Sequence, residues 1–177
     1  MLSARSSTVN LQGGVGAPLT FWYGARVQTI DVYTDGGCHG NPGPGAWAFV
    51  IQGGFSAEEA GADLATTNNR MELQAVIEAL RYLTRHRNAV AAVRIHTDSQ
   101  YVKNGINEWI HTWIRNGWRT AAKRPVKNQD LWIRLHELNQ LVQPSWVWVR
   151  GHAGNELNER CDALVQEYIG RIEQQIT

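Results

Sequence analysis

The stretch from Thr29 to Gly45 constrains the fold more than any other part of the chain. Its first seven residues, Thr29 to Asp35, are rich in β-branched and aromatic types that suit a half-buried strand. The next ten residues contain five glycines and two prolines, which predicts that the strand stops and the chain turns sharply. Asp35 therefore lies at the predicted end of a strand, beside backbone that can approach a ligand closely. An Asx-type turn explains the same residue, so a binding role and a structural role both stay open.

The composition is that of a globular protein with a sizeable core. The chain has 177 residues, of which 43% are hydrophobic, and no run of eighteen apolar residues occurs, so the pattern excludes a membrane span. Cys38 and Cys161 lie far apart and match no zinc-binding spacing, and they predict no disulfide framework. This cysteine usage suits a reducing interior, and we expect a cytoplasmic, monomeric protein.

The first 26 residues differ from the rest of the chain. They contain four glycines, no acidic residue and no periodic pattern, which predicts a flexible N-terminal extension. A start that bears Ser and Arg but no acid is also a feature of organelle transit peptides, and this alternative stays open. We place the folded domain at residues 27–173.

The remaining pattern predicts an α/β domain. Tight turns join the first three strands into an antiparallel meander, and a helix before the fourth strand implies a parallel crossover. The result is a five-stranded mixed sheet flanked by helices. Strands are expected at 29–35, 46–52, 55–64, 90–97 and 145–150, and helices at 70–86, 98–106, 108–114, 129–141 and 156–173. The buried stripe of the long first helix consists of Leu73, Val76, Ile77, Leu80 and Leu83.

Three further carboxylates resemble Asp35 in their setting. Glu72 lies one turn into the first helix, Asp98 ends the fourth strand, and Asp162 lies on the last helix beside apolar residues. Each has a structural alternative, such as support of a helix N-terminus or an N-cap. Together they suggest a site for hard cations, because clustered carboxylates repel one another unless a cation balances them, and oxygen ligands select Mg²⁺ or Mn²⁺.

Two such ions about 4 Å apart can activate a water and stabilise the departing oxygen of a phosphodiester. His152 lies in the loop Gly151–Gly154, where a histidine that titrates at working pH could carry a proton. A structural histidine is the alternative at this position.

A basic region lies between Lys103 and Arg134. It carries seven basic residues against two acidic ones, a local charge of +5, whereas the rest of the chain carries −4. Trp109, Trp113 and Trp118 are interleaved with these charges, a pattern typical of a surface that binds a phosphate backbone. A solvated loop with ordinary core tryptophans explains the same pattern.

At these residues the chain resembles the bacterial type-1 ribonuclease H family. The similarity extends over about residues 28–168, and its motifs follow the order found in that family. These motifs are residues 33–45 with Asp35, 66–73 with Glu72, 97–102 with Asp98, and 149–154 with His152, the last running on to Asp162.

The resemblance implies the ribonuclease H-like fold and endonucleolytic cleavage of the RNA strand of an RNA–DNA hybrid, giving 5′-phosphomonoesters, as in primer and R-loop removal. It implies Mg²⁺, with Mn²⁺ as an alternative, bound by Asp35, Glu72, Asp98 and Asp162, with His152 as a mobile auxiliary group. The residues that match nucleic-acid contacts are Cys38, Asn41, Asn68, Asn69 and Gln100 for the RNA strand, Thr67 for a DNA phosphate, and Trp109, Trp113, Trp118, Lys123, Arg124 and Lys127 in a protrusion that grips the DNA strand.

The protrusion departs from the family pattern because Ile114, Asn116 and Ala122 stand where basic residues would be usual. We therefore expect modest, salt-sensitive affinity. The alternatives are another nuclease of the same superfamily, a detached reverse-transcriptase domain, and a non-catalytic hybrid-binding module. Four intact, mutually repelling acids argue against a module that only binds.

Overall fold

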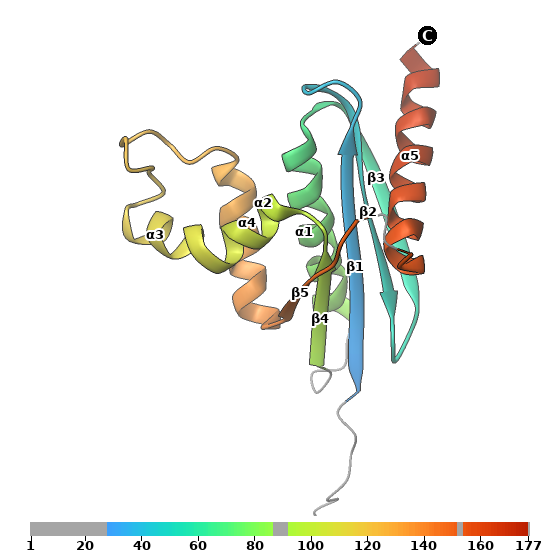
Figure 1. Ribbon diagram of the computed structural model, residues 1–177, viewed down its shortest axis with the longest axis horizontal. Helices are drawn as coiled ribbons and strands as arrows, with labels where there is room; N and C mark the ends of the chain where they lie inside the picture. The colour runs from blue at the N-terminus through green and yellow to red at the C-terminus, as the bar shows by residue number, and fades with distance from the viewer. Residues whose placement is uncertain (1–27, 87–91, 152–153, 177) are drawn as a thin grey trace, which may run out of the picture.

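The computed structural model describes residues 28–86, 92–151 and 154–176 (Figure 1). Its centre is a five-stranded sheet in the order β3-β2-β1-β4-β5. The strands β1, β2 and β3 pair antiparallel, while β4 pairs parallel with both β1 and β5, so the predicted mixed sheet is confirmed. The strands are β1 (Thr29–Cys38), β2 (Gly43–Gln52), β3 (Ala57–Thr66), β4 (Ala92–Thr97) and β5 (Ser145–Trp148).

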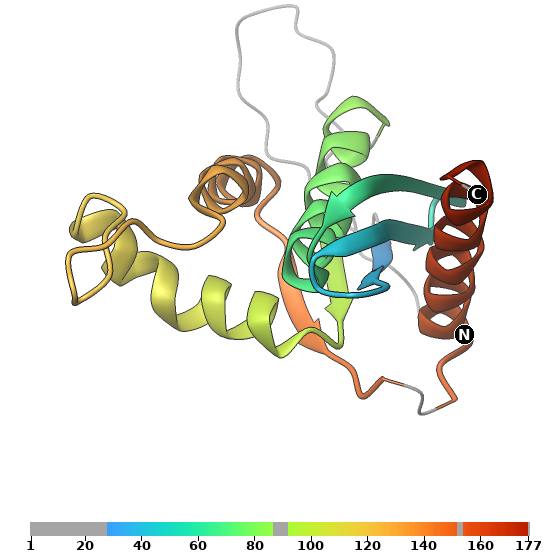
Figure 2. The same ribbon diagram turned by 90° about the horizontal axis from the view of Figure 1, so that it is seen from above.

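Helices cover both faces of this sheet. The helix α1 (Asn68–His86) packs on one face, with α4 (Gln129–Val142) against α1, and α5 (Glu156–Ile176) packs on the other face (Figures 1 and 2). The predicted stripe of α1, Leu73 to Leu83, is fully buried against the alternate side chains Ile30 and Val32 of β1. In the described part of the chain, no helix is both long enough and apolar enough to span a bilayer. The predicted N-terminal extension, residues 1–26, lies outside the described residues.

The predicted end of the first strand at Asp35 is wrong. β1 continues through Gly36 and Gly37 to Cys38, and these residues stay paired with β2, which begins at Gly43. The glycines therefore do not break the strand. Instead they remove side chains where another element comes close, since a Cβ at Gly36 would lie 2.2 Å from the carbonyl carbon of Met71 in α1.

One helical run was predicted as two pieces. Residues 100–115 form α2 (Gln100–Asn104), a π-helical turn η1 (Gly105–Trp109) and α3 (Ile110–Arg115) without a break. Gly105 faces Trp132 of α4, and a Cβ there would lie 1.9 Å from the indole ring. This close approach packs η1 against α4, and the run continues into α3, away from the sheet (Figure 2).

Candidate active site

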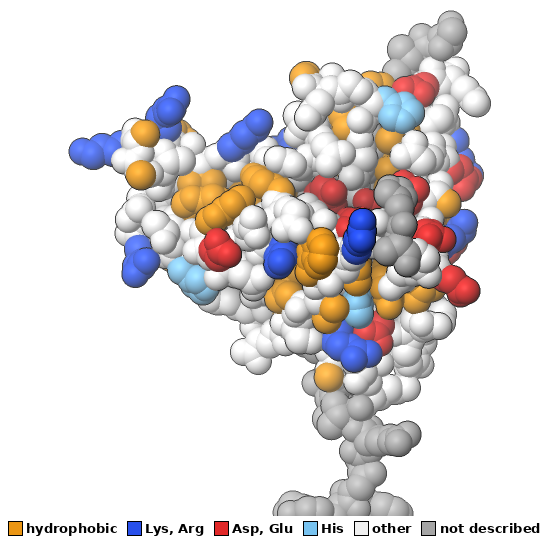
Figure 3. All heavy atoms as spheres, in the orientation of Figure 1, with side chains coloured by type: hydrophobic (Ala, Val, Ile, Leu, Met, Phe, Trp, Pro, Cys, Tyr) orange, Lys and Arg blue, Asp and Glu red, His pale blue; other side chains and the backbone are white. Residues whose placement is uncertain are grey.

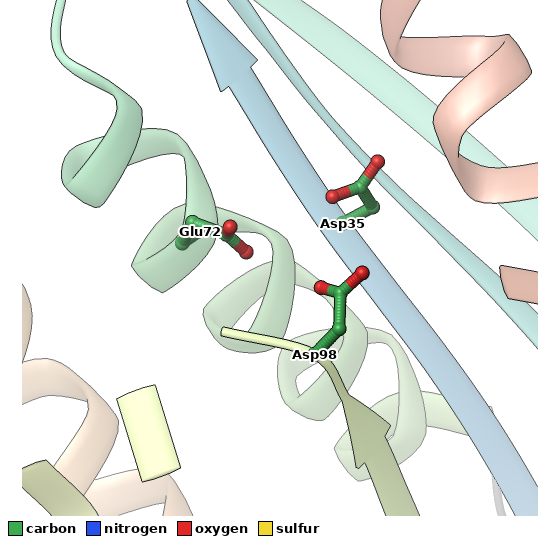
Figure 4. A group of neighbouring side chains, drawn as sticks. All are labelled: Asp35, Glu72 and Asp98. Atoms are coloured by element: carbon green, nitrogen blue, oxygen red, sulfur yellow. The ribbon is translucent and has the colours of Figure 1, made fainter. Parts of the chain in front are cut away.

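Three carboxylates from three different elements converge at one end of the sheet. Asp35 comes from β1, Glu72 from the start of α1, and Asp98 directly follows β4 (Figure 4). Each offers a carboxylate oxygen, and these oxygens all lie within 4.8 Å of one another. We call Asp35, Glu72 and Asp98 the acidic cluster.

The local fold explains why these side chains meet. β1 and β4 run parallel with Thr34 opposite Thr97, so the next residue of each strand, Asp35 and Asp98, lies at the same sheet end. Gly36 lets the first turn of α1 come against β1, which brings Glu72 to the two aspartates. The close packing that the cluster needs is thus provided by a residue without a side chain.

The structural alternatives for the two aspartates are wrong. Asp35 lies inside β1, paired with Ala48 of β2, and not in a turn. Asp98 is not the N-cap of α2; that role belongs to Ser99, whose Oγ accepts a hydrogen bond of 3.3 Å from the amide of Val102. Neither carboxylate is therefore explained by local secondary structure.

Glu72 carries the clearest electrostatic signal. Burial raises its pKa well above the usual range, and the negative charges of Asp35 and Asp98 raise it further, while a hydrogen bond from Asn68 acts in the opposite direction. Its Oε2 is buried and accepts no hydrogen bond from any residue that the structure describes. A buried carboxylate oxygen without a protein partner, facing two more carboxylates, fits a divalent cation with oxygen ligands.

Asn158 is a neighbour of the cluster to which the sequence analysis assigned no role. It lies on α5, is 3% exposed, and donates a hydrogen bond of 3.2 Å from Nδ2 to Oδ2 of Asp98. The contact joins residues sixty positions apart, so no local pattern predicts it. The only signal available was its place in the motif that runs from His152 to Asp162.

Asp162 and His152 were both predicted to belong to this site. Asp162 lies half-buried on α5 but is not part of the group whose oxygens lie within 4.8 Å. The Sγ of the adjacent Cys161 donates a hydrogen bond of 3.4 Å to the carbonyl of Tyr33, two residues before Asp35, so this turn of α5 packs on β1 near the cluster; burial raises the pKa of this thiol. His152 lies outside the described residues, whereas Gly151 lies beside Asp98: a Cβ there would be 2.6 Å from its Oδ2.

The polar residues predicted to contact RNA surround the same end of the sheet. Cys38 and Asn41 lie at the β1–β2 connection, and the Oδ1 of Asn41 accepts a hydrogen bond of 3.3 Å from the amide of Asn68. Asn69 follows in the first turn of α1, and Gln100 begins α2, two residues after Asp98. Thr67, which directly precedes Asn68, has a buried Oγ1 without a hydrogen-bond partner among the described residues.

The segment from Trp109 to Lys127, which we call the basic protrusion, extends away from the sheet beside α4 (Figure 2). Lys123, Arg124 and Lys127 are exposed. Figure 3 shows Lys and Arg side chains at the tip of this region, with hydrophobic side chains between the tip and the acidic side chains.

The three predicted tryptophans are half-buried. The ring centroid of Trp109 lies 5.7 Å from that of Trp113, which in turn lies 5.4 Å from that of the fully buried Trp132. Trp118 also packs against the core. The core-tryptophan alternative is therefore right in part, since each ring packs inside the molecule and still keeps an exposed edge.

Sequence comparison places this site in a known family. Residues 27–169 match the family model of RNase H. The chain is 49% identical over 154 residues to a ribonuclease H of Treponema denticola, which covers 79% of this chain and 96% of the relative. It is 53% identical over 147 residues to a ribonuclease H of Cupriavidus metallidurans (82% and 99%) and 56% identical over 138 residues to ribonuclease HI of Neisseria meningitidis (77% and 92%).

Solved structures agree with this assignment. LC9-RNase H1, a type 1 RNase H, is 31% identical and superimposes with a TM-score of 0.72, covering 81% of this chain and 73% of that protein. LC11-RNase H1 in complex with an RNA/DNA hybrid is 27% identical with a TM-score of 0.56, covering 81% and 98%. The chain belongs to the ribonuclease H family, as its motifs predicted.

Proposed function

We propose that this protein is an endonuclease that hydrolyses the RNA strand of RNA–DNA hybrids, with divalent metal ions held by the acidic cluster. The observation that supports this proposal most directly is the convergence of Asp35, Glu72 and Asp98 within a ribonuclease H fold. A similar protein, LC11-RNase H1, has been solved with an RNA/DNA hybrid. A module that only bound hybrids would gain nothing from three carboxylates that repel one another.

The donor set decides which ions fit. Asp35, Glu72 and Asp98 offer only carboxylate oxygens, which suit Mg²⁺, with Mn²⁺ as the alternative. Asp35, on the central strand, would be shared between two ions, and Asp162 on α5 would complete the ligand set. When bound, a pair of ions activates the attacking water and stabilises the departing oxygen of a phosphodiester.

Two further residues are assigned to support this chemistry. Asn158 fixes the carboxylate of Asp98 through the hydrogen bond to Oδ2, so we assign it a positioning role. His152 is proposed to move a proton during turnover. The neighbouring Gly151 already passes beside Asp98, so the histidine loop begins at the site itself.

Recognition of the RNA strand is assigned to amide side chains around the cluster. An amide group both donates and accepts hydrogen bonds, which suits a 2′-hydroxyl that does the same. Asn68 links this set to catalysis, because its side chain contacts Glu72 and its backbone amide contacts Asn41. The residues proposed to bind the RNA strand are Asn41, Asn68, Asn69 and Gln100, with the backbone near Cys38.

The DNA strand is assigned to the other side of the site. Thr67 would bind a DNA phosphate, and its buried Oγ1 has no hydrogen-bond partner among the described residues. The basic protrusion, with Trp109, Trp113 and Trp118 beside Lys123, Arg124 and Lys127, would hold the same strand further along. Such contacts place the hybrid without reading its sequence, which suits removal of primers and R-loops by a cytoplasmic monomer.

The test is a comparison of labelled duplexes in Mg²⁺. We expect cutting of RNA paired with DNA, little cutting of an RNA–RNA duplex and none of a DNA–DNA duplex. Asn69→Ala should slow hybrid cleavage by roughly fivefold or more, since a lost hydrogen bond costs about 1 kcal/mol. Arg85→Gln, at the far end of α1, is the control and should leave the rate unchanged. Equal cutting of a DNA duplex and a hybrid would contradict the proposal.

A further inference from the structure

The ammonium group of a lysine lies over the ring of an exposed tryptophan beside the acidic cluster. Trp148, the last residue of β5, is 44% exposed, one of few large hydrophobic side chains that the described surface leaves open. The Nζ of Lys103, on α2, lies 5.1 Å from the centroid of its ring. Both residues line a small hollow of about 50 Å³ together with Thr97. The sequence analysis counted Lys103 in the basic region but assigned no contact to either residue.

The backbone places this pair directly next to the cluster. Trp148 is the parallel-sheet partner of Thr97, the residue before Asp98, and the amide of Val149 donates to the carbonyl of Thr97 at 3.1 Å. The chain then reaches Gly151, which approaches Oδ2 of Asp98. Figure 3 shows basic and hydrophobic side chains next to the acidic ones on this face.

The charge of Lys103 is not used inside the protein. Within the described residues, no carboxylate lies at ion-pair distance from its Nζ, whereas most of the arginines on the sheet and long helices are paired, such as Arg94 with Asp31 and Arg160 with Glu58. The aromatic ring holds the ammonium group in place by a cation–π contact, and its remaining N–H groups stay available. An ammonium fixed on a flat apolar face matches one unit of a nucleic-acid backbone, with a phosphate for the charge and a sugar for the ring.

We propose that Lys103 and Trp148 form a contact site for the RNA strand, next to the phosphate that is cleaved. This inference rests on the proposed function. The RNA strand is favoured because Lys103 shares the short helix α2 with Gln100 and follows Asp98 by five residues, while the basic protrusion assigned to DNA begins only at Trp109, the last residue of η1. Lys103 binds a backbone phosphate that flanks the cut, and Trp148 packs against the adjoining ribose.

The first measurement is binding of a short hybrid to the full-length protein in EDTA, over a range of salt concentrations. Lys103→Gln should flatten the slope of log affinity against log salt by about one unit, as expected for one lost phosphate contact. Trp148→Phe should weaken binding less than Trp148→Leu, which should lose roughly two- to fivefold, the size of an exposed cation–π contact. Arg85→Gln is the matched control and should keep the parent slope.

The second measurement identifies the strand. Each hybrid in a series carries one neutral methylphosphonate, at a different position along one of the two strands. The parent should bind more weakly when the methylphosphonate lies at one RNA-strand position near the cut. For Lys103→Gln, substitution at that position should not change the affinity, while substitutions elsewhere should act as they do for the parent. The inference would be overturned if Lys103→Gln lost its sensitivity to the methylphosphonate at a DNA-strand position, or at no position at all. Cleavage of the unmodified hybrid by the parent in Mg²⁺ is measured in the same series, because its loss would defeat the proposed function instead.

Discussion

The acidic cluster and the basic protrusion are held together in opposite ways. The cluster gathers three like charges from β1, α1 and the end of β4, with Glu72 buried and its pKa raised. The protrusion is one continuous segment whose charges are exposed. Backbone hydrogen bonds within the segment close it, among them the bond of 3.1 Å from the amide of Val126 to the carbonyl of Trp118, and the ring of Trp113 packs on that of Trp132.

Mutations in the two regions should therefore change different properties of the protein, catalysis in one and affinity in the other. The rest of the fold must stabilise the cluster against its own repulsion, so a mutation there should abolish chemistry without unfolding the protein. The protrusion stabilises itself through packing, and its charges are available to a partner. Mutations of those charges should change affinity and salt dependence and leave the chemical step alone.

Asp98→Asn should reduce hybrid cleavage by at least about 100-fold, because metal-ion stabilisation of a transition state is worth several kcal/mol. The side chain keeps its shape, and the amide can still contact Asn158, so the melting temperature should not fall. Single-turnover cleavage and thermal unfolding in the same buffer check both points. Glu137→Gln, on the exposed face of α4, is the charge-matched control. A loss of less than tenfold would remove Asp98 from the metal site.

Replacement of Lys123, Arg124 and Lys127 by Ala should weaken binding to hybrids of every sequence alike, since phosphate contacts carry no base information. The slope of log affinity against log salt should flatten by about one unit for each lost contact. The rate at saturating enzyme should stay close to that of the parent. A parental slope would show that these side chains face solvent in the complex, and the contrast between the two regions would then fail.

Glu72→Gln should stabilise the metal-free protein at neutral pH. The pKa of Glu72 is raised in the folded state, so the carboxyl destabilises the fold at neutral pH. This penalty is absent below about pH 4, where the carboxyl is protonated in both states, grows as the pH rises above the unfolded pKa, and is complete above the folded pKa. A stability gain of about 1 kcal/mol corresponds to a rise in melting temperature of roughly 2–4 °C for a chain of this size.

Saturating Mg²⁺ should reverse this order, because only the parent gains stability from the bound ions. Thermal unfolding of the parent and of Glu72→Gln is compared near pH 4 and at neutral pH, each in EDTA and in Mg²⁺. If Glu72→Gln were destabilising at neutral pH in EDTA, the carboxylate would have a structural role that the cluster does not explain.

Much of this contrast could be predicted from the sequence. The tight turns and the crossover helix predicted the mixed sheet, and the spacing of apolar residues predicted the buried stripe of α1, because burial of Leu73 to Leu83 follows helical periodicity. Asp35 and Asp98 were predicted as members of one group of carboxylates, although β1 does not end at Asp35. The basic protrusion was visible as a contiguous charge pattern, and its exposed lysines bear this out.

The rest depended on contacts between distant residues. The glycines after Asp35 looked like a turn, whereas Gly36 serves the close packing of Met71 on α1, a neighbour that no local pattern reveals. The contact of Asn158 with Asp98 has the same long-range character. Gly105 against Trp132 explains why two predicted helices form one run, and this too required the position of α4.

The most direct test of the central claim is single-turnover cleavage of a hybrid labelled on its RNA strand, with the parent and Asp35→Asn side by side in Mg²⁺ and in EDTA. We expect nicked RNA only with the parent in Mg²⁺, and for Asp35→Asn a rate below about a hundredth of the parent rate, with hybrid binding retained. RNA cleavage in EDTA, or a variant that cuts faster than that limit, would contradict metal-dependent catalysis by the acidic cluster.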